Sequence, residues 1–199
     1  MTGAVTIAAI VEGEGEVAAL PVLLRRIAEE LSVWAVRIPT PRRVPRSKLV
    51  APGGIESAVL QASYQVDGRG GILLLIDADD DCPATTGPAL LERARRARGD
   101  QEISMVLANR EFEAWFLAAA TSLAGRRGLA DSLEPPADPE GPRDAKGWLS
   151  ARKTDGTSYR PTADQAALTA IFDMAQARKN APSFDKFWRD VERLIRSGL

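Results

Sequence analysis

Acidic side chains gather at three points of the chain, and they are the residues best suited to do chemistry. Each group comes after a run of apolar residues: Glu12, Glu14 and Glu16 follow 4–11; Asp77, Asp79, Asp80 and Asp81 follow 72–76; Glu111 and Glu113 come shortly after 103–107. Crowded like charges repel one another unless a cation neutralises them. Carboxylate oxygens are the usual ligands of hard divalent ions, so the pattern predicts a site for Mg²⁺ or Mn²⁺.

The residue types that are missing narrow the chemistry further. The chain of 199 residues contains no histidine, which excludes a Ser-His-Asp triad, a Cys-His dyad and histidine-based zinc sites. Cys82 is the only cysteine, so an internal disulfide and a multi-thiolate zinc site are excluded as well, and we expect no redox role for it. Acid–base or metal chemistry therefore falls mainly to Asp, Glu, Lys, Arg or Tyr.

Alternating strands and helices are expected to position these acids. The apolar runs 4–11, 33–38, 72–76 and 103–107 predict four strands, and the segments 17–31, 55–66, 87–98 and 111–120 predict helices. This order is typical of an α/β fold with a mainly parallel, Rossmann-like sheet that helices cover on both faces. Ligands bind at the carboxyl ends of such strands, so we expect the three acidic groups at that edge.

The remaining segments give weaker signals. The Pro- and Arg-rich segment 39–52 predicts an exposed loop. Over 123–158 the pattern weakens into Gly, Pro and charged residues, and 134–139 within it predicts a mobile loop. A helix is expected over 163–178, with Thr162 as its N-cap and Gln165 as the capping-box partner.

The chain length suits one α/β domain with a helical appendage, or two small domains that share a core. We expect the α/β domain over residues 1–122, and a loop and helical extension over residues 123–199 that packs on the same core. The last helix is expected to follow Ser183, with a buried stripe made of Phe184, Phe187, Trp188, Val191, Leu194 and Ile195.

Two short motifs resemble the TOPRIM domain, which occurs in topoisomerases, primases, recombination-repair proteins and the overcoming-lysogenization-defect nucleases. Val11-Glu12-Gly13 follows one hydrophobic strand, and Asp77-Ala78-Asp79 follows another. The spacing through Glu16 and the run from Asn109 to Leu117 more closely resemble a bacterial family of unknown function classed as TOPRIM-like. The resemblance implies a TOPRIM fold in which Glu12 is a general base or metal ligand and Asp77 and Asp79 hold magnesium.

The candidate site residues fall into three sets. Catalytic roles are expected for Glu12, Glu16, Asp77 and Asp79. Metal ligation is expected from Glu12, Asp77, Asp79, Asp81 and Glu113. Nucleic-acid contacts are expected from Arg42, Arg43, Arg46, Lys48 and Lys153. Simpler interpretations stand beside these, because aspartates readily cap turns and helices, and a glutamate in the first turn of a helix suits the helix dipole.

The acidic pattern predicts a divalent-metal site, and the resemblance to TOPRIM proteins implies that it serves Mg²⁺-dependent phosphodiester chemistry on DNA or RNA, as in a TOPRIM-type nuclease of a bacterial defence or repair system. The alternative is a non-catalytic binding module that partners a separately encoded ATPase, since the chain itself has no GxxxxGK[ST] loop. A sugar-nucleotide enzyme would leave the Glu-rich loop after the first strand without a role. An α/β phosphatase would need an aspartate where Glu12 stands.

The overall charge and the opening residues bear on partners and location. With 26 basic and 27 acidic residues the net charge is −1, so local basic patches, rather than the global field, would have to bind a nucleic acid. Residues 1–7 lack the basic start of a secretion signal, and no segment is long and apolar enough to span a membrane. We therefore expect a cytoplasmic protein that does not bind membranes.

Overall fold

A parallel β-sheet forms the centre of the computed structural model, which describes residues 4–66 and 68–199. The strands are β1 (Val5–Val11), β2 (Val36–Arg37), β3 (Arg42–Arg43), β4 (Gly70–Asp77) and β5 (Glu102–Ala108). Their order is β2-β1-β4-β5, with β3 also paired to β1, and these pairings are parallel. The expected α/β, Rossmann-like fold is confirmed. Residues 1–3, where the segment examined for a secretion signal begins, lie outside the described residues.

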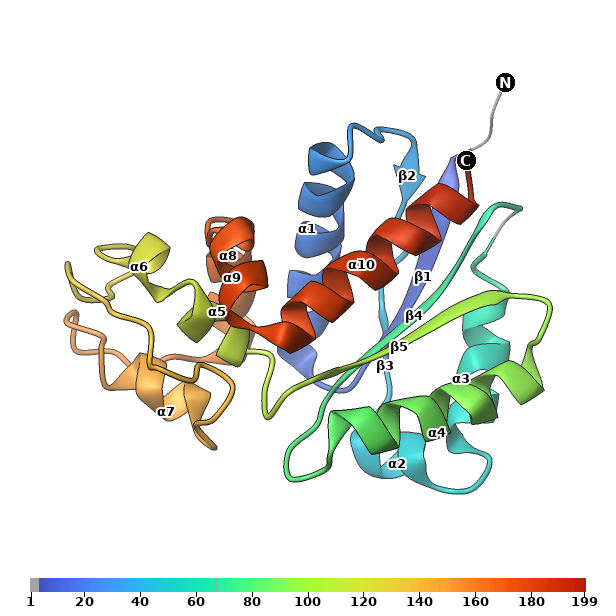
Figure 1. The fold of residues 1–199 in the computed structure, drawn as a ribbon, viewed down its shortest axis with the longest axis horizontal. Coiled ribbons are helices and arrows are strands. Elements are labelled where there is room, and N and C mark those ends of the chain that lie inside the picture. Colours follow the sequence, from blue (N-terminus) through green and yellow to red (C-terminus); the bar gives the residue numbers. More distant parts are fainter. Residues whose placement is uncertain (1–3, 67) are drawn as a thin grey trace.

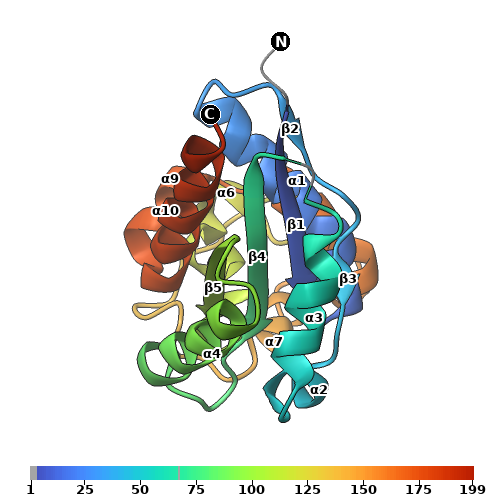
Figure 2. The ribbon, with the colours of Figure 1, turned by 90° about the vertical axis from the view of Figure 1, so that its right-hand side faces the viewer.

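Helices cover both faces of the sheet, as Figure 2 shows. One face packs against α1 (Glu14–Glu30) and α10 (Pro182–Ser197), and the other packs against α3 (Gly54–Ser63) and α4 (Pro83–Ala97). Every residue of β1 is buried, because side chains on both sides of the strand meet a layer of helices. The strands therefore read as continuous apolar runs in the sequence rather than as an alternation.

The C-terminal helix α10 shares the core of the sheet. Its predicted stripe from Phe184 to Ile195 is buried. The rings of Phe184 and Phe187 lie 5.1 and 5.0 Å from the ring of Trp115, measured between centroids. Aromatic pairs at this separation add to the stabilisation from apolar burial. The end of the chain is thus fixed to the segment that follows β5.

Two segments beside the sheet differ from expectation. Segment 39–52, predicted as a loop, contains β3 and the short helix α2 (Arg46–Val50). The helix predicted over 111–120 is divided into α5 (Ala114–Ala118) and α6 (Ala120–Leu123). It begins late because the chain first makes a tight turn, in which the Ala114 N–H donates to the Glu111 carbonyl at 3.0 Å.

Segment 123–158 contains a helix that the sequence analysis missed. This helix, α7 (Ala145–Ser150), is capped by Asp144, whose carboxylate accepts a hydrogen bond from the Gly147 N–H at 2.7 Å. An aspartate before a short apolar segment is an ordinary N-cap signal, and here it stands in a Gly- and Pro-rich context that hides it.

The single helix predicted over 163–178 is wrong. The chain there forms the short π-helix η1 (Pro161–Gln165) and the helices α8 (Ala166–Thr169) and α9 (Met174–Asn180), so Thr162 lies inside η1 and is not an N-cap. The break has a tertiary cause, because Arg26 of α1 donates to the carbonyls of Thr169 and Phe172 at 2.7 and 2.9 Å. These bonds satisfy carbonyl groups that a continuing helix would use.

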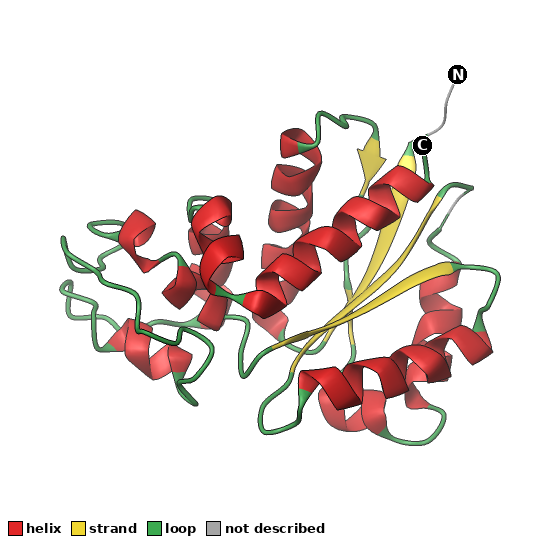
Figure 3. Ribbon diagram, viewed as in Figure 1, coloured by secondary structure: helices red, strands yellow, loops and turns green. Residues whose placement is uncertain are grey.

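Helices α5 to α9 and their loops form a lobe beyond the carboxyl ends of the strands. Figure 1 shows this carboxyl-edge lobe (residues 114–180) at the end of the molecule away from both termini, and Figure 3 shows how much of it is loop. Within the described part of the chain, no helix combines the length and the apolar character that a membrane span requires.

Because α10 shares the core of the sheet, we expect the chain to unfold in one transition. Phe187 is fully buried, so Phe187→Ala should lower the free energy of unfolding by about 3–5 kcal/mol. Urea denaturation followed by tryptophan fluorescence and by circular dichroism measures this, and both signals should shift together. Arg189→Ala, on the exposed side of α10, should cost less than about 1 kcal/mol. Two transitions, of which Phe187→Ala displaces one, would contradict a shared core.

Candidate functional site

The carboxyl ends of β1, β4 and β5 bring the three acidic groups to one edge of the sheet. Val11 pairs with Leu75, and Asp77 pairs with Ala108, so the three strands end side by side. The residues that follow them leave the sheet at neighbouring positions, as expected for parallel strands.

Asp77 lies at the centre of this edge. Its Oδ1 accepts a hydrogen bond from the Phe112 N–H at 2.7 Å, and its Oδ2 lies 4.0 Å from Lys146 Nζ. Burial raises the pKa of Asp77 well above its ordinary value, and the negative charges of Glu113 and Glu12 add to the rise. Asp77 is therefore electrostatically connected to the acids at the other two strand ends.

Glu12, directly after β1, keeps a carboxylate oxygen without a partner. Its Oε2 is buried, and no residue within 4–66 and 68–199 makes a hydrogen bond to it. Burial, together with the negative charges of Glu16 and Asp79, raises the pKa of Glu12 to about 7, and Arg46 opposes the rise. A carboxyl group with this pKa exchanges its proton near neutral pH, which suits a general base.

Lys146, carried by α7, places an ammonium group among the acids. Its Nζ lies 3.1 Å from Glu111 Oε2, 3.1 Å from Glu113 Oε2 and 4.0 Å from Asp77 Oδ2. Burial by itself lowers the pKa of Lys146, but these three negative charges raise it above its usual value, so the ammonium stays protonated. The sequence analysis missed Lys146, and its one local signal is the N-cap Asp144 of the helix that carries it.

Glu113 is fully buried and joined to the carboxyl-edge lobe. Tyr159 donates to its Oε1 at 2.9 Å, while Lys146 pairs with its Oε2. Burial raises the pKa of Glu113, and both of these contacts oppose the rise. Burial and the Glu113 charge raise the pKa of Tyr159, so the phenol remains a donor. Glu113, an expected metal ligand, contacts protein groups through both carboxylate oxygens.

Glu16 caps the start of α1. Its Oε2 accepts from the Gly13 N–H at 2.5 Å, and its Oε1 accepts from Gln165 Nε2 at 3.3 Å. The start of α1 and η1 approach so closely that a Cβ at position 15 would lie 1.9 Å from Gln165 Oε1. This close approach explains why position 15 is a glycine. Gln165 thus reaches Glu16 instead of capping its own helix. Glu16, expected to be catalytic, has a capping role in this structure.

Arg46 of α2 braces the acidic loop after β4. Its Nη1 donates to the Asp77 carbonyl at 2.7 Å, its Nη2 pairs with Asp81, and its Nε lies 3.7 Å from Asp79 Oδ2. Sequence analysis assigned Arg46 to nucleic-acid binding and Asp81 to metal binding. The structure pairs the two with each other.

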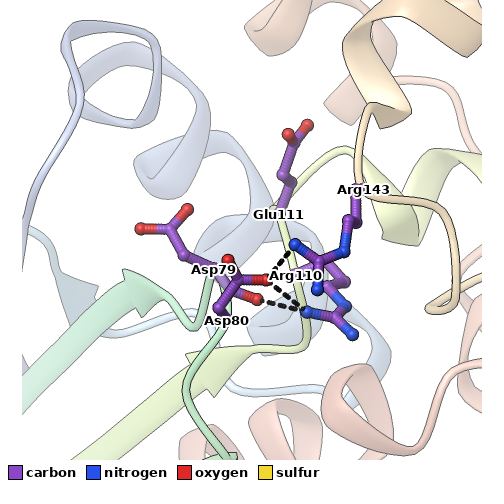
Figure 4. Close-up of a pocket in the computed structure, with 5 residues that line it drawn as sticks. All are labelled: Asp79, Asp80, Arg110, Glu111 and Arg143. Atoms are coloured by element: carbon purple, nitrogen blue, oxygen red, sulfur yellow. Dashed lines mark hydrogen bonds and ion pairs between the residues drawn. The ribbon is translucent and has the colours of Figure 1, made fainter.

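A hollow of about 130 Å³ lies beside this loop and is lined by Asp79, Asp80, Arg110, Glu111 and Arg143. Figure 4 shows Arg110 and Arg143 reaching the Asp80 carboxylate, while the side chains of Asp79 and Glu111 point away from it. Neither arginine belongs to a basic cluster in the sequence, and for this reason sequence analysis missed both.

The basic residues of β3 and α2 lie on the side of β1. Arg42 donates to Gln61 Oε1, and Arg43 pairs with Glu14 at 3.5 Å. Lys48 is exposed on α2. Arg43 and Lys48 therefore present accessible positive charge near the start of the acidic edge.

Lys153 is held inside the carboxyl-edge lobe. Its Nζ donates to the Arg127 carbonyl at 2.8 Å and pairs with Asp155 at 3.4 Å, and the side chain is largely covered. Its position supports a structural role within the lobe more than the expected contact with nucleic acid.

The donors at this edge suit a hard divalent ion held by few protein ligands. Among the residues that the structure describes, no three acidic or thiol side chains already form a set of metal ligands. Mg²⁺ commonly takes one or two carboxylates and keeps several waters. Glu12 offers a buried oxygen without a partner, and the nearby exposed Asp79 repels it. The carboxylates here that could hold one such ion are those of Asp77 and Asp79, with the unpartnered oxygen of Glu12 at the next strand end.

The raised pKa of Glu12 makes stability depend on pH. The folded protein keeps this proton until about pH 7, whereas the ordinary value is 4.5, so its stabilising contribution is present below pH 4.5 and is lost as the pH rises to 7. Glu12→Gln cannot ionise. At pH 8 the free energy of unfolding of this variant should exceed that of wild type by on the order of 2 kcal/mol, a figure reduced for the partial exposure of Glu12. At pH 5 the gain should be much smaller.

Urea denaturation at both pH values in EDTA measures this difference. Glu14→Gln, which alters the exposed carboxylate two residues along, is the matched control and should follow the wild-type profile. A gain in Glu12→Gln that is equal at pH 5 and pH 8 would contradict the raised pKa.

Removing the Lys146 charge should destabilise the folded protein in a pH-dependent way. Lys146→Met leaves three carboxylates without their counter-charge, and since the lysine is 39% exposed we expect a loss of about 1–3 kcal/mol at pH 8. The loss should shrink at pH 5, because Asp77 and Glu113 have raised pKa values and take up protons. Thermal unfolding of the variant, with the exposed Lys179→Met as control, tests this. An equal loss at both pH values would refute the charge-balancing role.

Comparison with known proteins identifies the family. The model of a family described as a domain of unknown function (DUF4276) matches residues 11–192. No curated protein and no solved structure matches the chain. The matched segment includes Glu12, Asp77, Glu113 and Lys146 and spans most of the 199 residues. The chain therefore belongs to the DUF4276 family.

Proposed function

We propose that the chain hydrolyses phosphodiester bonds of DNA or RNA with Mg²⁺ or Mn²⁺, as a TOPRIM-type nuclease. The observation that carries the proposal is the position of Glu12, Asp77 and Asp79 at neighbouring strand ends, with a buried Glu12 oxygen that has no hydrogen-bond partner among the described residues. An arrangement of this kind is costly without a cation. Carboxylates with shifted pKa values at the carboxyl edge of a parallel sheet favour a functional site.

Each acid has a distinct role in this proposal. Asp77 and Asp79 would hold the ion, which when bound supplies polarisation of a phosphate oxygen and stabilises the charge that develops there. Glu12 would accept a proton from the attacking water, since its pKa of about 7 suits proton transfer at neutral pH. The water oxygen bonds to phosphorus, the P–O bond to one sugar oxygen breaks, and that oxygen takes a proton from solvent.

Lys146 divides the acidic edge into two parts. Its ammonium group lies 3.1 Å from both Glu111 and Glu113 and offsets part of their negative charge. The cation nearest to Asp79 is more distant, since Arg46 Nε lies 3.7 Å from its Oδ2, and this supports placing the ion on the side of Glu12 and Asp79. In this proposal Glu113 positions Lys146 rather than binding the ion itself.

A second candidate function is a non-catalytic binding module that partners a separately encoded ATPase. The observation that favours it is the same Lys146, because a cluster that already contains an ammonium group needs an ion less. Binding of nucleic acid without cleavage, in the presence of Mg²⁺ or Mn²⁺, would support this function and contradict the nuclease.

The nuclease proposal predicts that cleavage depends on the acids of the β1 and β4 exits. Glu12→Gln and the double variant Asp77→Asn/Asp79→Asn should each lower the rate of Mg²⁺-dependent cleavage of plasmid and single-stranded DNA by at least about 100-fold. The asparagine at position 77 still accepts the bond from the Phe112 N–H, so the fold should be kept. Calorimetric titration should show that the double variant also loses Mg²⁺ and Mn²⁺ binding.

Glu92→Gln is the control, because Glu92 is an exposed carboxylate of α4 paired with Arg96. It should cleave at the wild-type rate. Wild-type protein that binds neither ion, or cleavage that survives in both acid variants, would rule out the proposed site.

A further inference from the structure

Two arginines hold one carboxylate oxygen between them at the mouth of the acidic edge. Arg110 Nη1 donates to Asp80 Oδ1 at 2.9 Å, and Arg143 Nη1 lies 2.8 Å from the same oxygen. The arginines come from different parts of the chain, since Arg110 follows β5 and Arg143 precedes α7. They converge beside Asp79 and Glu111, as Figure 4 shows.

The backbone that presents Arg110 is held in an unusual conformation. Arg110 and Asp79 have φ values of +64° and +52°, which residues other than glycine rarely adopt. The Asp79 N–H donates to the Arg110 carbonyl at 3.0 Å, and Arg110 Nη1 donates to the Asp79 carbonyl at 2.9 Å. Such strain persists where its surroundings enforce it, and it concentrates at functional sites. These bonds fix the Arg110 guanidinium relative to the acidic loop.

Stability alone does not account for the contact between Arg143 and Asp80. The side chains of Arg143 and Asp80 are 72% and 69% exposed. Ion pairs this exposed contribute little to folding, because water screens both charges. Both guanidinium groups use the same Asp80 oxygen, whereas a phosphate offers several oxygens to the two planar donors at once.

We propose that Arg110 and Arg143 form a phosphate-binding fork for a nucleic-acid strand, and that the Asp80 carboxylate occupies the phosphate position in the free protein. The inference rests on the proposed nuclease function, whose site adjoins the fork through Asp79. The acids of the edge repel an approaching phosphate, and two guanidinium groups beside them reverse that repulsion locally. Asp80 competes with the strand for the fork.

Fluorescence anisotropy with a short labelled single strand in EDTA measures binding without cleavage. Arg143→Ala and Arg110→Asn should each weaken the affinity about tenfold, because each removes a charge-assisted contact. Each should also reduce, by about one, the magnitude of the slope of the logarithm of the binding constant against the logarithm of the salt concentration. Asparagine tolerates the left-handed backbone at position 110, so the fold should be kept. Asp80→Asn should bind roughly two- to fivefold more tightly, because the competing charge is gone.

The ion pair of Arg96 and Glu92 on α4 provides matched controls. Arg96 is 74% exposed, so Arg96→Ala and Glu92→Gln remove similar charges away from the fork, and both should bind like wild type. Strands with a 5′-phosphate or a 5′-hydroxyl distinguish the two sources of phosphate. Equal losses on both strands identify an internal phosphodiester, and a loss confined to the phosphorylated strand identifies a terminal phosphate.

Several results would overturn the fork: wild-type protein that does not bind the strand, unchanged affinity in both arginine variants, or an Asp80→Asn variant that binds no more tightly than wild type. Cleavage with Mg²⁺ is read separately from binding. If the fork fails while Glu12-dependent cleavage persists, the nuclease proposal survives. If the arginine variants weaken binding while wild type never cleaves, the fork survives and the nuclease does not.

Discussion

Repulsion between carboxylates at the carboxyl edge of the sheet is the constraint on which the rest of the site depends. Parallel pairing of β1, β4 and β5 brings three acidic strand exits together, and burial makes their charges costly. Two cations from outside the sheet reduce this repulsion. Lys146 lies among Asp77, Glu111 and Glu113, and Arg46 of α2 contacts the loop after β4. Glu12 is left with a raised pKa and a buried oxygen that lacks a partner within the described residues, and this remaining imbalance is what a divalent ion would relieve.

The carboxyl-edge lobe completes the site rather than merely following the α/β core. It supplies Lys146, the Tyr159 hydroxyl that bonds Glu113, and the Gln165 amide that bonds Glu16. The lobe is short of regular structure, and its position depends on packing against the sheet through α10 and the aromatic rings around Trp115. The chemistry of the edge and the stability of the core are therefore linked, because the same packing holds both.

The differences between expected and observed elements have one common cause. Long apolar runs and the stripe of α10 were predicted well, because the local spacing of apolar residues indicates burial on both faces of a strand or on one face of a helix. Short elements were predicted poorly, because tertiary contacts decide where they begin and end. The helix expected over 163–178 breaks where Arg26 takes the carbonyls of Thr169 and Phe172, and β3 forms only because β1 offers an edge for Arg42 and Arg43 to pair with.

The sequence by itself determined the α/β fold, the parallel pairing of the strands, and the positions of Glu12, Asp77 and Asp79 just after strands. These follow from hydrophobic runs and from the rule that parallel strands end at one edge. Tertiary structure alone decided that Lys146 enters the acidic edge and that Arg110 and Arg143 meet at Asp80. Such contacts join residues 30 or more positions apart through irregular loops, and no local periodicity encodes how those loops pack.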